Sequence, residues 1–489
     1  MCLLNAEKKD VMGMLSVDEI RLFIENDAAS VRKKAAKIGQ RYYEAEHDIR
    51  DYRIFYYDAD GNLKEDKYKS NIKISHPFFT ELVDQEAQYI ISGGNAFIRS
   101  DDPELQKELN EYFNDNEDFL SELYEIITGC VVKGFEYAYA FKDAKGKVRF
   151  QCADSIGVVE VRESATDDGC DYIIYWYLDR IDKDSKYIKR IQVWDKEQTW
   201  FFCQVDDGDI LPDDSQGINP RPHTLYTNGK DGKIYFEGFG FIPFFRLDNN
   251  RKQVSGLKAI KALIDDYDLL NCGLSNNIQD TSEALYVVKG FQGDNLDELM
   301  TNIRSKKHIG VDDEGGVEIQ TVSIPVDARK VKLEMDETNI YRFGMGLNTH
   351  GLRDNVTTTN MAIKAAYSLL DLKTNRLEIR LKQFLRKLLD VVLREINKEN
   401  GTDYTQHDVY FVFDRIIPTN ILENADIELK KAQKRQTEIN TILNLATVID
   451  DETKLQLIAE QLDIDYNELK EKVPDVTEDL FARLDGADA

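Results

Sequence analysis

GMGLNTHGLRDNVTT (residues 344–358) leads directly into the longest helical pattern of the chain, over residues 360–397. Three Gly residues and several Asn, Asp and Thr residues predict an irregular loop in the first part. The second part contains no Gly or Pro, and its apolar residues recur three and four positions apart. These apolar residues are Ala362, Ala366, Leu369, Leu377, Leu381, Leu385, Leu388 and Val392. We therefore expect a polar loop that continues into a long amphipathic helix.

The charge of this helix differs from that of the chain. Between Thr359 and Lys398 there are nine Lys or Arg residues and four Asp or Glu residues, whereas the 489-residue chain has a net charge of −27. In the preceding loop, Gly344, Gly346 and Gly351 place few limits on φ and ψ, so we expect local mobility there. A basic helix entered through a mobile loop suggests contact with a polyanion.

Length and composition limit the possible classes of protein. A chain of 489 residues predicts two to four domains, and a hydrophobic share of 42% is typical of globular proteins. The net charge argues against an ordinary nucleic-acid-binding module with a basic face, but is compatible with a protein that DNA passes without adhering. The six Cys residues form no C-x-x-C pair, which favours reduced, buried thiols. Neither a signal peptide nor an apolar run of membrane-spanning length is visible, and the start at Met1 or Met14 stays open.

The N-terminal part reads as helical. Ser16 and Glu19 have the spacing of a capping box, and we expect helix from residue 16 to about 49, broken near Asn26–Asp27. A polar stretch with a turn at Asp60–Gly61 follows. Further helices are expected at residues 77–92, 103–114 and 116–131.

The pattern then changes to a period of two, which is typical of strands. Strands are expected at residues 134–141, 147–152, 158–161, 172–178, 188–195 and 199–204. Residues 205–240 read as loop, and residues 240–250 close the β-rich part.

Two helices surround a small insertion. In the helix expected at residues 255–283, seven positions form a seam for a neighbouring helix: Leu257, Ile260, Ile264, Tyr267, Asn271, Leu274 and Ile278. A strand at 285–289, a helix at 295–306 and a strand at 317–324 follow, and then a helix at 327–343. The insertion of about forty residues is too small to be stable alone, so we expect a neighbouring copy or a partner to complete it.

After the long helix, residues 408–413 predict one strand that rejoins an earlier sheet. Short helices are expected at residues 424–448, 451–462 and 467–472. The whole pattern predicts an α+β fold that is mainly helical.

Signatures of catalysis are absent from the sequence. There is no P-loop, no H-E-x-x-H and no G-x-S-x-G motif, so we predict no catalytic residue, no metal site and no cofactor. The acidic pair Asp265–Asp266 is interpreted as solvated surface. The acidic run Asp312–Glu314 is interpreted in the same way, as a turn before Gly315–Gly316. His47 follows Tyr42–Tyr43 at a helix end; it is a candidate ligand or base, but a capping or packing role is favoured.

Several short stretches, in their order, resemble the portal proteins of tailed bacteriophages, in the branch from long-tailed phages of Gram-positive hosts. The matching stretches are Tyr42-Tyr43-x-x-x-His47-Asp48-Ile49, residues 82–93, Phe241-Ile-Pro-Phe with Asn249–Asn250, residues 285–291, and Asn355-x-Thr-x-x-Asn360 running into residues 362–364 and 370–373. The resemblance covers about residues 30–415.

The resemblance implies a protomer with wing, stem, clip and crown regions that assembles into a ring, typically dodecameric, with a central channel. It implies a wing at 1–250, a stem helix at 251–283, a clip at 284–325 and a second stem helix at 326–343. A tunnel loop at 344–358, a long wing helix with the returning strand at 359–420 and a helical crown at 421–489 would follow.

The resemblance also implies partners and site residues. The partners would be double-stranded DNA in the channel, terminase, a head-completion adaptor, and the major capsid and scaffolding proteins, without a membrane. The protein would reside at the capsid vertex of the virion, and in the host cytoplasm during assembly. Residues expected to face DNA are Asn348, His350, Arg353, Asn355 and Lys364. Lys373, Arg376 and Arg380 would face either the channel or a neighbouring subunit. Clip residues expected to face terminase or the adaptor are Asp294, Asn295, Glu298, Arg304, Lys306 and Lys307.

Two alternatives stay open at this point. One is a metal-dependent DNA-processing enzyme that uses clustered carboxylates, and the missing ligand motifs weigh against it. The other is a different oligomeric structural protein of the virion, and the order helix, insertion, helix weighs against that.

Overall fold

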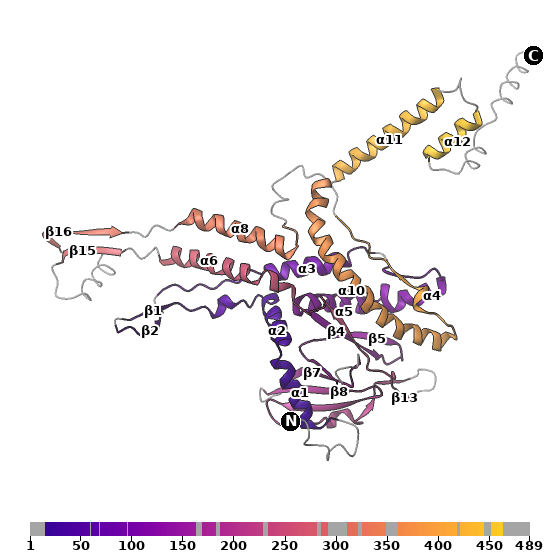
Figure 1. Cartoon of the computed structure of the whole chain (residues 1–489), viewed down its shortest axis with the longest axis horizontal. Helices are drawn as coiled ribbons and strands as arrows, with labels where there is room; N and C mark the ends of the chain where they lie inside the picture. The colour runs from indigo at the N-terminus through magenta and orange to yellow at the C-terminus, as the bar shows by residue number, and fades with distance from the viewer. Residues whose placement is uncertain are drawn as a thin grey trace, which may run out of the picture. The chain divides into compact units, whose positions relative to one another are not determined.

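The computed structural model describes most of the chain and divides it into two compact units (Figure 1). The described residues are 15–58, 60–67, 69–94, 96–162, 169–181, 186–227, 233–280, 285–291, 311–320, 325–348, 360–417, 421–444 and 451–462. Unit 1 comprises residues 1–348 and 367–416, and unit 2 comprises residues 349–366 and 417–489. Each unit is described separately below.

Two short helices open unit 1. Helix α1 (Val17–Ala29) begins with the predicted capping box, in which the Glu19 N–H donates to Ser16 Oγ and the Ser16 N–H donates to the Glu19 carboxylate at 2.8 Å. Ser30 ends α1, and its hydroxyl accepts the Lys33 N–H to begin α2 (Val31–Tyr43). The break therefore lies at Ser30 and not at Asn26–Asp27, because the Ser30 side chain caps the first turn of α2. The helix also ends at Tyr43, six residues earlier than predicted, and only a short 3-10 turn, η1 (Asp48–Asp51), follows.

Three helices form the centre of unit 1, close to the predicted bounds. They are α3 (Phe78–Ile90), α4 (Pro103–Leu109), which continues as a π turn over Asn110–Asn114, and α5 (Glu117–Lys133). Gly134 ends α5 with φ of 93°, a left-handed conformation that glycine adopts without strain.

A three-stranded antiparallel sheet packs on α5. Its strands are β4 (Phe135–Lys142), β5 (Val148–Ala153) and β14 (Phe244–Asp248), in the order β14-β4-β5. Side chains of this sheet share one apolar core with α3, α5 and the long helix α10. This core fixes the relative positions of the elements that carry the candidate site.

A second antiparallel sheet lies under α1 and has the order β10-β9-β8-β7-β6. Its main strands are β6 (Val158–Val161), β7 (Tyr172–Ile181), β8 (Tyr187–Trp194) and β9 (Gln198–Val205). Ile20 and Ile24 of α1 pack on Val159, Ile174 and Trp200 of this sheet. All four strands were predicted within a few residues.

The stretch predicted as loop at residues 205–240 contains four short strands. They are β10 (Leu211–Pro212), β11 (Arg221–Pro222), β12 (Thr224–Thr227) and β13 (Ile234–Glu237). β10 and β11 both pair with β9, and β12 pairs with β13. The prediction failed because pairing with an existing strand overrides the low strand propensity of Gly-rich and Pro-rich sequence.

A pair of long helices extends from the body of unit 1 and leads to a hairpin (Figure 1). Helix α6 (Lys261–Asp280) follows a 3-10 turn at Gly256–Ala259, and α8 (Val326–Gly344) runs beside it. Strands β15 (Leu285–Phe291) and β16 (Val311–Gln320) pair antiparallel at the far end. Both predicted strands of the insertion are confirmed, although β16 begins six residues earlier; the helix expected at 295–306 lies outside the described residues.

The apolar seam predicted on α6 is only half right. Leu257, Ile260 and Ile264 are buried, but Ile278 is 60% exposed. After Ile264 the buried side chains of α6 are Asp268 and Cys272. These two are covered by an extended segment, residues 70–76, whose contacts with α6 the sequence pattern did not reveal.

Helix α10 (Asn360–Asn400) confirms the long helix, with the predicted face buried from Leu377 to Val392. Near its start Leu370 is buried and Leu369 is partly exposed, so the predicted face is shifted by one residue there. The returning strand is β17 (Tyr410–Phe411), which is shorter than the predicted 408–413. It pairs with β3 (Ile98–Arg99) in a separate two-stranded sheet, so the prediction that it joins one of the earlier sheets is wrong. A separate exposed hairpin is formed by β1 (Phe55–Tyr57) and β2 (Leu63–Glu65), around the predicted turn.

Unit 2 contains the first turns of α10 and two further helices, α11 (Ile421–Asn444) and α12 (Asp451–Leu462). Both helices were predicted, α12 with its bounds. The helix expected at residues 467–472 lies outside the described residues.

Candidate functional site

The chain after α8 is held against α3 by a pair of hydrogen bonds. The Leu347 N–H donates to Gln85 Oε1 at 2.8 Å, and Gln85 Nε2–H donates to the Leu347 carbonyl at 3.0 Å. The Leu347 side chain is also buried. The loop expected at 344–358 is therefore anchored through Leu347.

Two glycines allow this close approach. A Cβ atom on Gly344 would lie 2.6 Å from Leu82 Cδ1, and one on Gly346 would lie 2.0 Å from Leu82 Cδ2. Between them Met345 ends α8 in the left-handed conformation, with φ of 54°. The prediction that these glycines give mobility is wrong for Gly344 and Gly346, which are buried and serve close packing against α3. Gly351 lies outside the described residues.

The structure describes two of the five residues expected to face DNA. Asn348 follows the anchor, and its Nδ2–H donates to Glu337 Oε1 at 3.4 Å. His350, Arg353 and Asn355 lie outside the described residues. Lys364 is exposed on the second turn of α10, within unit 2.

Farther along α10, the three cations expected to face the channel or a neighbouring subunit differ in their surroundings. Lys373 Nζ lies 2.8 Å from Glu86 Oε2, and Glu86 is buried in α3. The charge of Lys373 is thus engaged within the chain. Arg376 is exposed and Arg380 is half-buried, and neither forms an ion pair with any residue that the structure describes. Glu378, which lies between them, pairs instead with Lys382 and Arg415.

Arg415 ties the returning strand to α10. Its guanidinium lies 3.0 Å from Asp371 and donates to Asn375 at 2.7 Å, and it also pairs with Glu378. The Tyr89 hydroxyl donates to Asp371 at 3.0 Å, and the Tyr89 ring lies under the guanidinium. These contacts join α3, α10 and residues 410–416 beside the point where the chain passes into unit 2 at residue 417.

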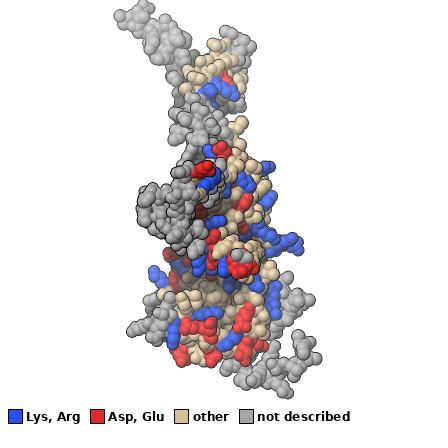
Figure 2. Space-filling model, turned by 90° about the vertical axis from the view of Figure 1, so that its left-hand side faces the viewer, with Lys and Arg blue, Asp and Glu red and all other residues tan. Residues whose placement is uncertain are grey.

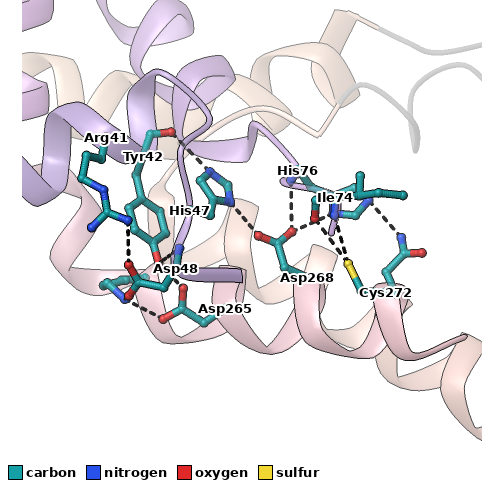
Figure 3. Close-up of polar contacts among 11 residues, drawn as sticks. Arg41, Tyr42, His47, Asp48, Ile74, His76, Asp265, Asp268 and Cys272 are labelled. Carbon is teal, nitrogen blue, oxygen red and sulfur yellow. Dashed lines mark hydrogen bonds and ion pairs between the residues drawn. The ribbon is translucent and has the colours of Figure 1, made fainter. Parts of the chain in front are cut away.

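At the base of α6, one buried carboxylate binds two histidines (Figure 3). Asp268 Oδ2 lies 2.6 Å from His47 Nδ1, and Asp268 Oδ1 lies 2.7 Å from His76 Nδ1. Burial alone would raise the pKa of Asp268, but the hydrogen bonds from the two histidines outweigh burial and lower that pKa below its ordinary value. The packing role predicted for His47 is confirmed, since the ring is fully buried and stacks on Tyr42.

The other ring nitrogen of His47 contacts the backbone. His47 Nε2 lies 3.3 Å from the Tyr42 carbonyl. The two contacts of the His47 ring, with Asp268 and with the Tyr42 carbonyl, join the end of α2 to α6.

The sequence suggested that Asp265 and Asp266 are solvated surface residues, but both form specific contacts within the chain. The Tyr42 hydroxyl donates to Asp265, whose other oxygen accepts a hydrogen bond from Lys261 at 2.7 Å. Lys261 also contacts Asp48 at 2.6 Å, and these carboxylates raise the pKa of Lys261 although burial opposes the shift. Asp266 pairs with Lys332 of α8. The two carboxylates thus connect α6 to its two neighbours.

The extended segment at residues 70–76 lies along α6, and every second backbone N–H of the segment donates a hydrogen bond to this helix. Side chains four residues apart on α6 accept these hydrogen bonds. The pairs are Ser70 with Asp280 (3.2 Å), Ile72 with Asn276 (2.6 Å), Ile74 with Cys272 Sγ (3.2 Å) and His76 with Asp268 (3.0 Å). The sequence missed this arrangement because neither partner shows a periodic apolar pattern.

Chemistry of other kinds finds little support in the described part of the chain. No group of three or more His, Cys, Asp or Glu residues there could hold a metal ion. Burial raises the pKa of the Cys130 and Cys272 thiols, as expected for buried cysteines. In the regions that the structure describes, no helix has the length and apolar character needed to span a membrane.

The residues expected to face terminase or the adaptor fall outside the described regions. Asp294, Asn295, Glu298, Arg304, Lys306 and Lys307 all lie between β15 and β16. The structure gives only the strands that support them, with Val288 opposite Val317 and Leu285 opposite Gln320.

The surface agrees with the charge argument. Figure 2 shows that lysines and arginines on one face are interspersed with acidic side chains and do not form one continuous basic surface. Such a face lacks the dense phosphate contacts that make DNA binding tight.

Comparison with known proteins identifies the family. Residues 24–466 match the model of the family described as "Phage portal protein, SPP1 Gp6-like". The portal protein of Bacillus phage SPP1 is 30% identical over 349 residues, which cover 71% of this chain and 67% of that protein. The portal protein of Clostridium phage phiCD119 is 23% identical over 478 residues, covering 94% of this chain and all of that protein. The chain therefore belongs to the SPP1 Gp6-like family of phage portal proteins.

Proposed function

We propose that this chain forms the ring at the unique vertex of a phage capsid, through which DNA enters during packaging and leaves at infection. As a member of the portal family the chain is a structural protein of the capsid vertex and not an enzyme. The ring, its typically dodecameric size and its central channel are part of the proposal. The observation that carries it is the family match over residues 24–466, together with the pair α6–α8 that ends in a hairpin.

In this proposal α6 and α8 are the stem, and residues 284–325 form the clip that binds terminase and later the head-completion adaptor. Residues 1–250 and 359–420 are the wing, and residues 421–489 are the crown. The major capsid and scaffolding proteins contact the ring during assembly in the host cytoplasm. A two-stranded insertion this small supports the clip assignment, because it needs neighbours to bury its apolar surface.

The loop between α8 and α10 would narrow the channel. Its root is fixed by Leu347 and Gln85, so a moving part would begin at Asn348. Arg353 and Lys364 are the proposed DNA contacts, with Asn348, His350 and Asn355 beside them. The chain has a net charge of −27, so these two cations would contact the DNA phosphates without the many contacts that make binding tight. Such weak contact would let the DNA slide through the channel. The pairing of Lys373 with Glu86 makes Arg376 and Arg380 the better candidates for contact with DNA or with a neighbouring subunit.

Electron microscopy of the purified chain tests the ring. We expect closed rings with a central channel, and a monodisperse monomer at all concentrations would contradict the proposal. In rings that assemble normally, Arg353→Ala with Lys364→Ala should change the packaging or retention of DNA. Unaltered packaging would remove both residues from the DNA contact.

The clip assignment is tested separately by deletion of residues 290–320. We expect the shortened chain to fold and to lose terminase binding, since the deleted residues include all six proposed contacts. Unchanged terminase binding by the deletion variant would place the docking surface elsewhere.

A further inference from the structure

The hairpin β1–β2 has no core of its own. Its three residue pairs are Phe55 with Glu65, Tyr56 with Lys64 and Tyr57 with Leu63, and all six side chains are exposed. No third strand pairs with either edge among the described residues. A lone two-stranded hairpin is marginally stable in water, so this one needs a surface to cover it.

The two faces of the hairpin differ in chemistry. Side chains of directly opposed residues lie on the same face, and successive residues alternate between faces. One face therefore carries Phe55, Tyr57 and Leu63 with Glu65, and the other carries Tyr56 and Lys64. On the first face Phe55 is 52% exposed, Tyr57 is 74% exposed and Leu63 is 58% exposed. The first face is an uncovered apolar surface, called here the hairpin face (Phe55, Tyr57, Leu63).

A second uncovered apolar surface lies on α8. Val331 and Met335, four residues apart, are each 55% exposed, and Thr338 and Arg342 continue the same exposed stripe. The side of α8 that faces the body holds Lys332, Asp336 and Ile340, of which Lys332 contacts Asp266 of α6. The stripe (Val331, Met335) thus points away from the chain's own α6.

The two surfaces do not cover each other within one chain. The segment that follows the hairpin, residues 70–76, is bound to α6 through Asp268, Cys272, Asn276 and Asp280. Figure 1 shows the hairpin extending from the body on the same side as α6 and α8. Each surface is therefore available to another copy that presents the opposite one.

Charge favours the same pairing. Residues 52–76 contain five Lys or Arg and four Asp or Glu, whereas α6 and α8 together contain five basic and eight acidic residues. In a chain of net charge −27, the hairpin segment is one of the few slightly basic parts, and the helix pair is acidic.

We propose that the hairpin face of one subunit packs on the Val331–Met335 stripe of the adjacent subunit. Two different patches of one chain that bind each other make a head-to-tail contact, and such contacts form a ring when the rotation between adjacent subunits closes. The inference rests on the proposed ring, and it adds which surfaces hold adjacent subunits together. The occupant of each surface is a second copy of this chain.

The first test compares variants of the two faces of the hairpin. Phe55→Ser with Tyr57→Ser and Leu63→Ser removes the apolar face, and Tyr56→Ser is the matched control on the opposite face. Native mass spectrometry over a range of protein concentrations measures the fraction in rings. We expect the triple variant to need at least about tenfold more protein for half assembly, and the control to assemble like the unaltered chain. Val331→Gln with Met335→Gln should have the effect of the triple variant.

The second test does not depend on the stability of the triple variant. Chains with Tyr57→Cys are mixed with chains with Met335→Cys, assembled and treated with a short bismaleimide. We expect cross-linked dimers that contain one chain of each kind, and only background from either variant alone.

The outcomes separate the inference from the ring. If unaltered rings form but the triple variant assembles equally well and no mixed cross-link appears, the inference is wrong and the ring stands. Cross-links within Tyr57→Cys chains alone would show a self-complementary contact, which also contradicts it. Normal rings of the triple variant that fail to enter capsids would assign the hairpin to a capsid protein and overturn the second-copy occupant. Absence of rings from the unaltered chain would remove the proposed function itself.

Discussion

Lys373 Nζ lies 2.8 Å from Glu86 Oε2, so a cation of the long helix α10 neutralises a carboxylate buried in α3. The neighbouring Arg376 is exposed and forms no ion pair with the described residues. Two cations three residues apart on one helix thus have different tasks, and their substitutions should have different effects.

Lys373→Met should destabilise the folded chain, whereas Arg376→Met should not. The first change leaves Glu86 buried without a counter-charge, which costs about 3 kcal/mol, the lower end for a broken buried pair because Lys373 keeps some solvent access. Thermal unfolding followed by circular dichroism measures both. Equal midpoints for the two variants would show that the ion pair contributes nothing to stability.

Gln85→Ala should loosen the root of the loop without unfolding α3. The change removes both hydrogen bonds to Leu347, and the loss of about 1 kcal/mol raises the fraction of open root about fivefold. Hydrogen–deuterium exchange of the peptide that contains residues 344–348 is the measurement. Gln88→Ala, an exposed position on the same helix, is the control. If both variants exchange alike in this peptide, the anchor is not Gln85.

Gly346→Ala should destabilise the chain by about 1–3 kcal/mol through overpacking. The new Cβ atom would lie 2.0 Å from Leu82 Cδ2, so the buried Leu82 side chain has to move to admit it. Gly169→Ala, where a Cβ atom meets nothing within 4 Å, is the control in thermal unfolding.

A double variant tests whether Leu82 is the side chain that opposes Gly346→Ala. Leu82→Ala opens space beside residue 346, so Gly346→Ala should cost less in that background, with a coupling of about 1 kcal/mol or more. Strictly additive costs would point to the other neighbour of the new Cβ atom, Gln85 Oε1 at 3.1 Å, instead of Leu82.

Asp268→Asn should make the stability of the folded chain less dependent on pH in the acid range. The lowered pKa of Asp268 means that the folded state favours the carboxylate. The contribution is complete above the unfolded pKa of about 3.9 and is lost as the pH falls through the lower folded pKa. Between about pH 6 and pH 3, the unfolding midpoint of the unaltered chain should therefore fall more than that of Asp268→Asn.

The control for this pH dependence is Asp60→Asn, which makes the same charge change at an exposed turn. It should follow the unaltered chain over the whole range. Parallel curves for all three proteins would show that the two histidines do not stabilise the carboxylate.

The sequence predicted most helices and the main strands because their patterns are local. Residues 360–397, 158–161 and 199–204 carry their periodicity within themselves, and the structure has them within a few residues. The failures come from contacts distant in sequence. The strands at 211–237 exist through pairing with β9 and with each other, and the buried side of α6 is set by residues 70–76.

The candidate site was less predictable than the fold. Gly344 and Gly346 were singled out, but their role depends on Leu82, which is 262 residues from Gly344. The burial of Leu82 can be predicted from the apolar face of α3. The role of Gln85 cannot be predicted, because a polar residue at a half-exposed helix position resembles any surface residue. The contacts of Asp265, Asp266 and Asp268 show the same limit, since carboxylates are frequent in this chain.

The four hydrogen bonds between residues 70–76 and α6 join two backbones whose repeats nearly match in length. Two residues of extended chain advance about 6.6 Å, and four residues of helix advance about 6.0 Å and turn about 40° beyond a full turn. Over the three steps from Asp268 to Asp280 the mismatch accumulates to about 2 Å, and the accepting side chains rotate by about 120° around α6. The geometry of the two backbones therefore makes the segment 70–76 wind around α6 by about a third of a turn between His76 and Ser70. These four hydrogen bonds tie the chain that follows the β1–β2 hairpin to α6.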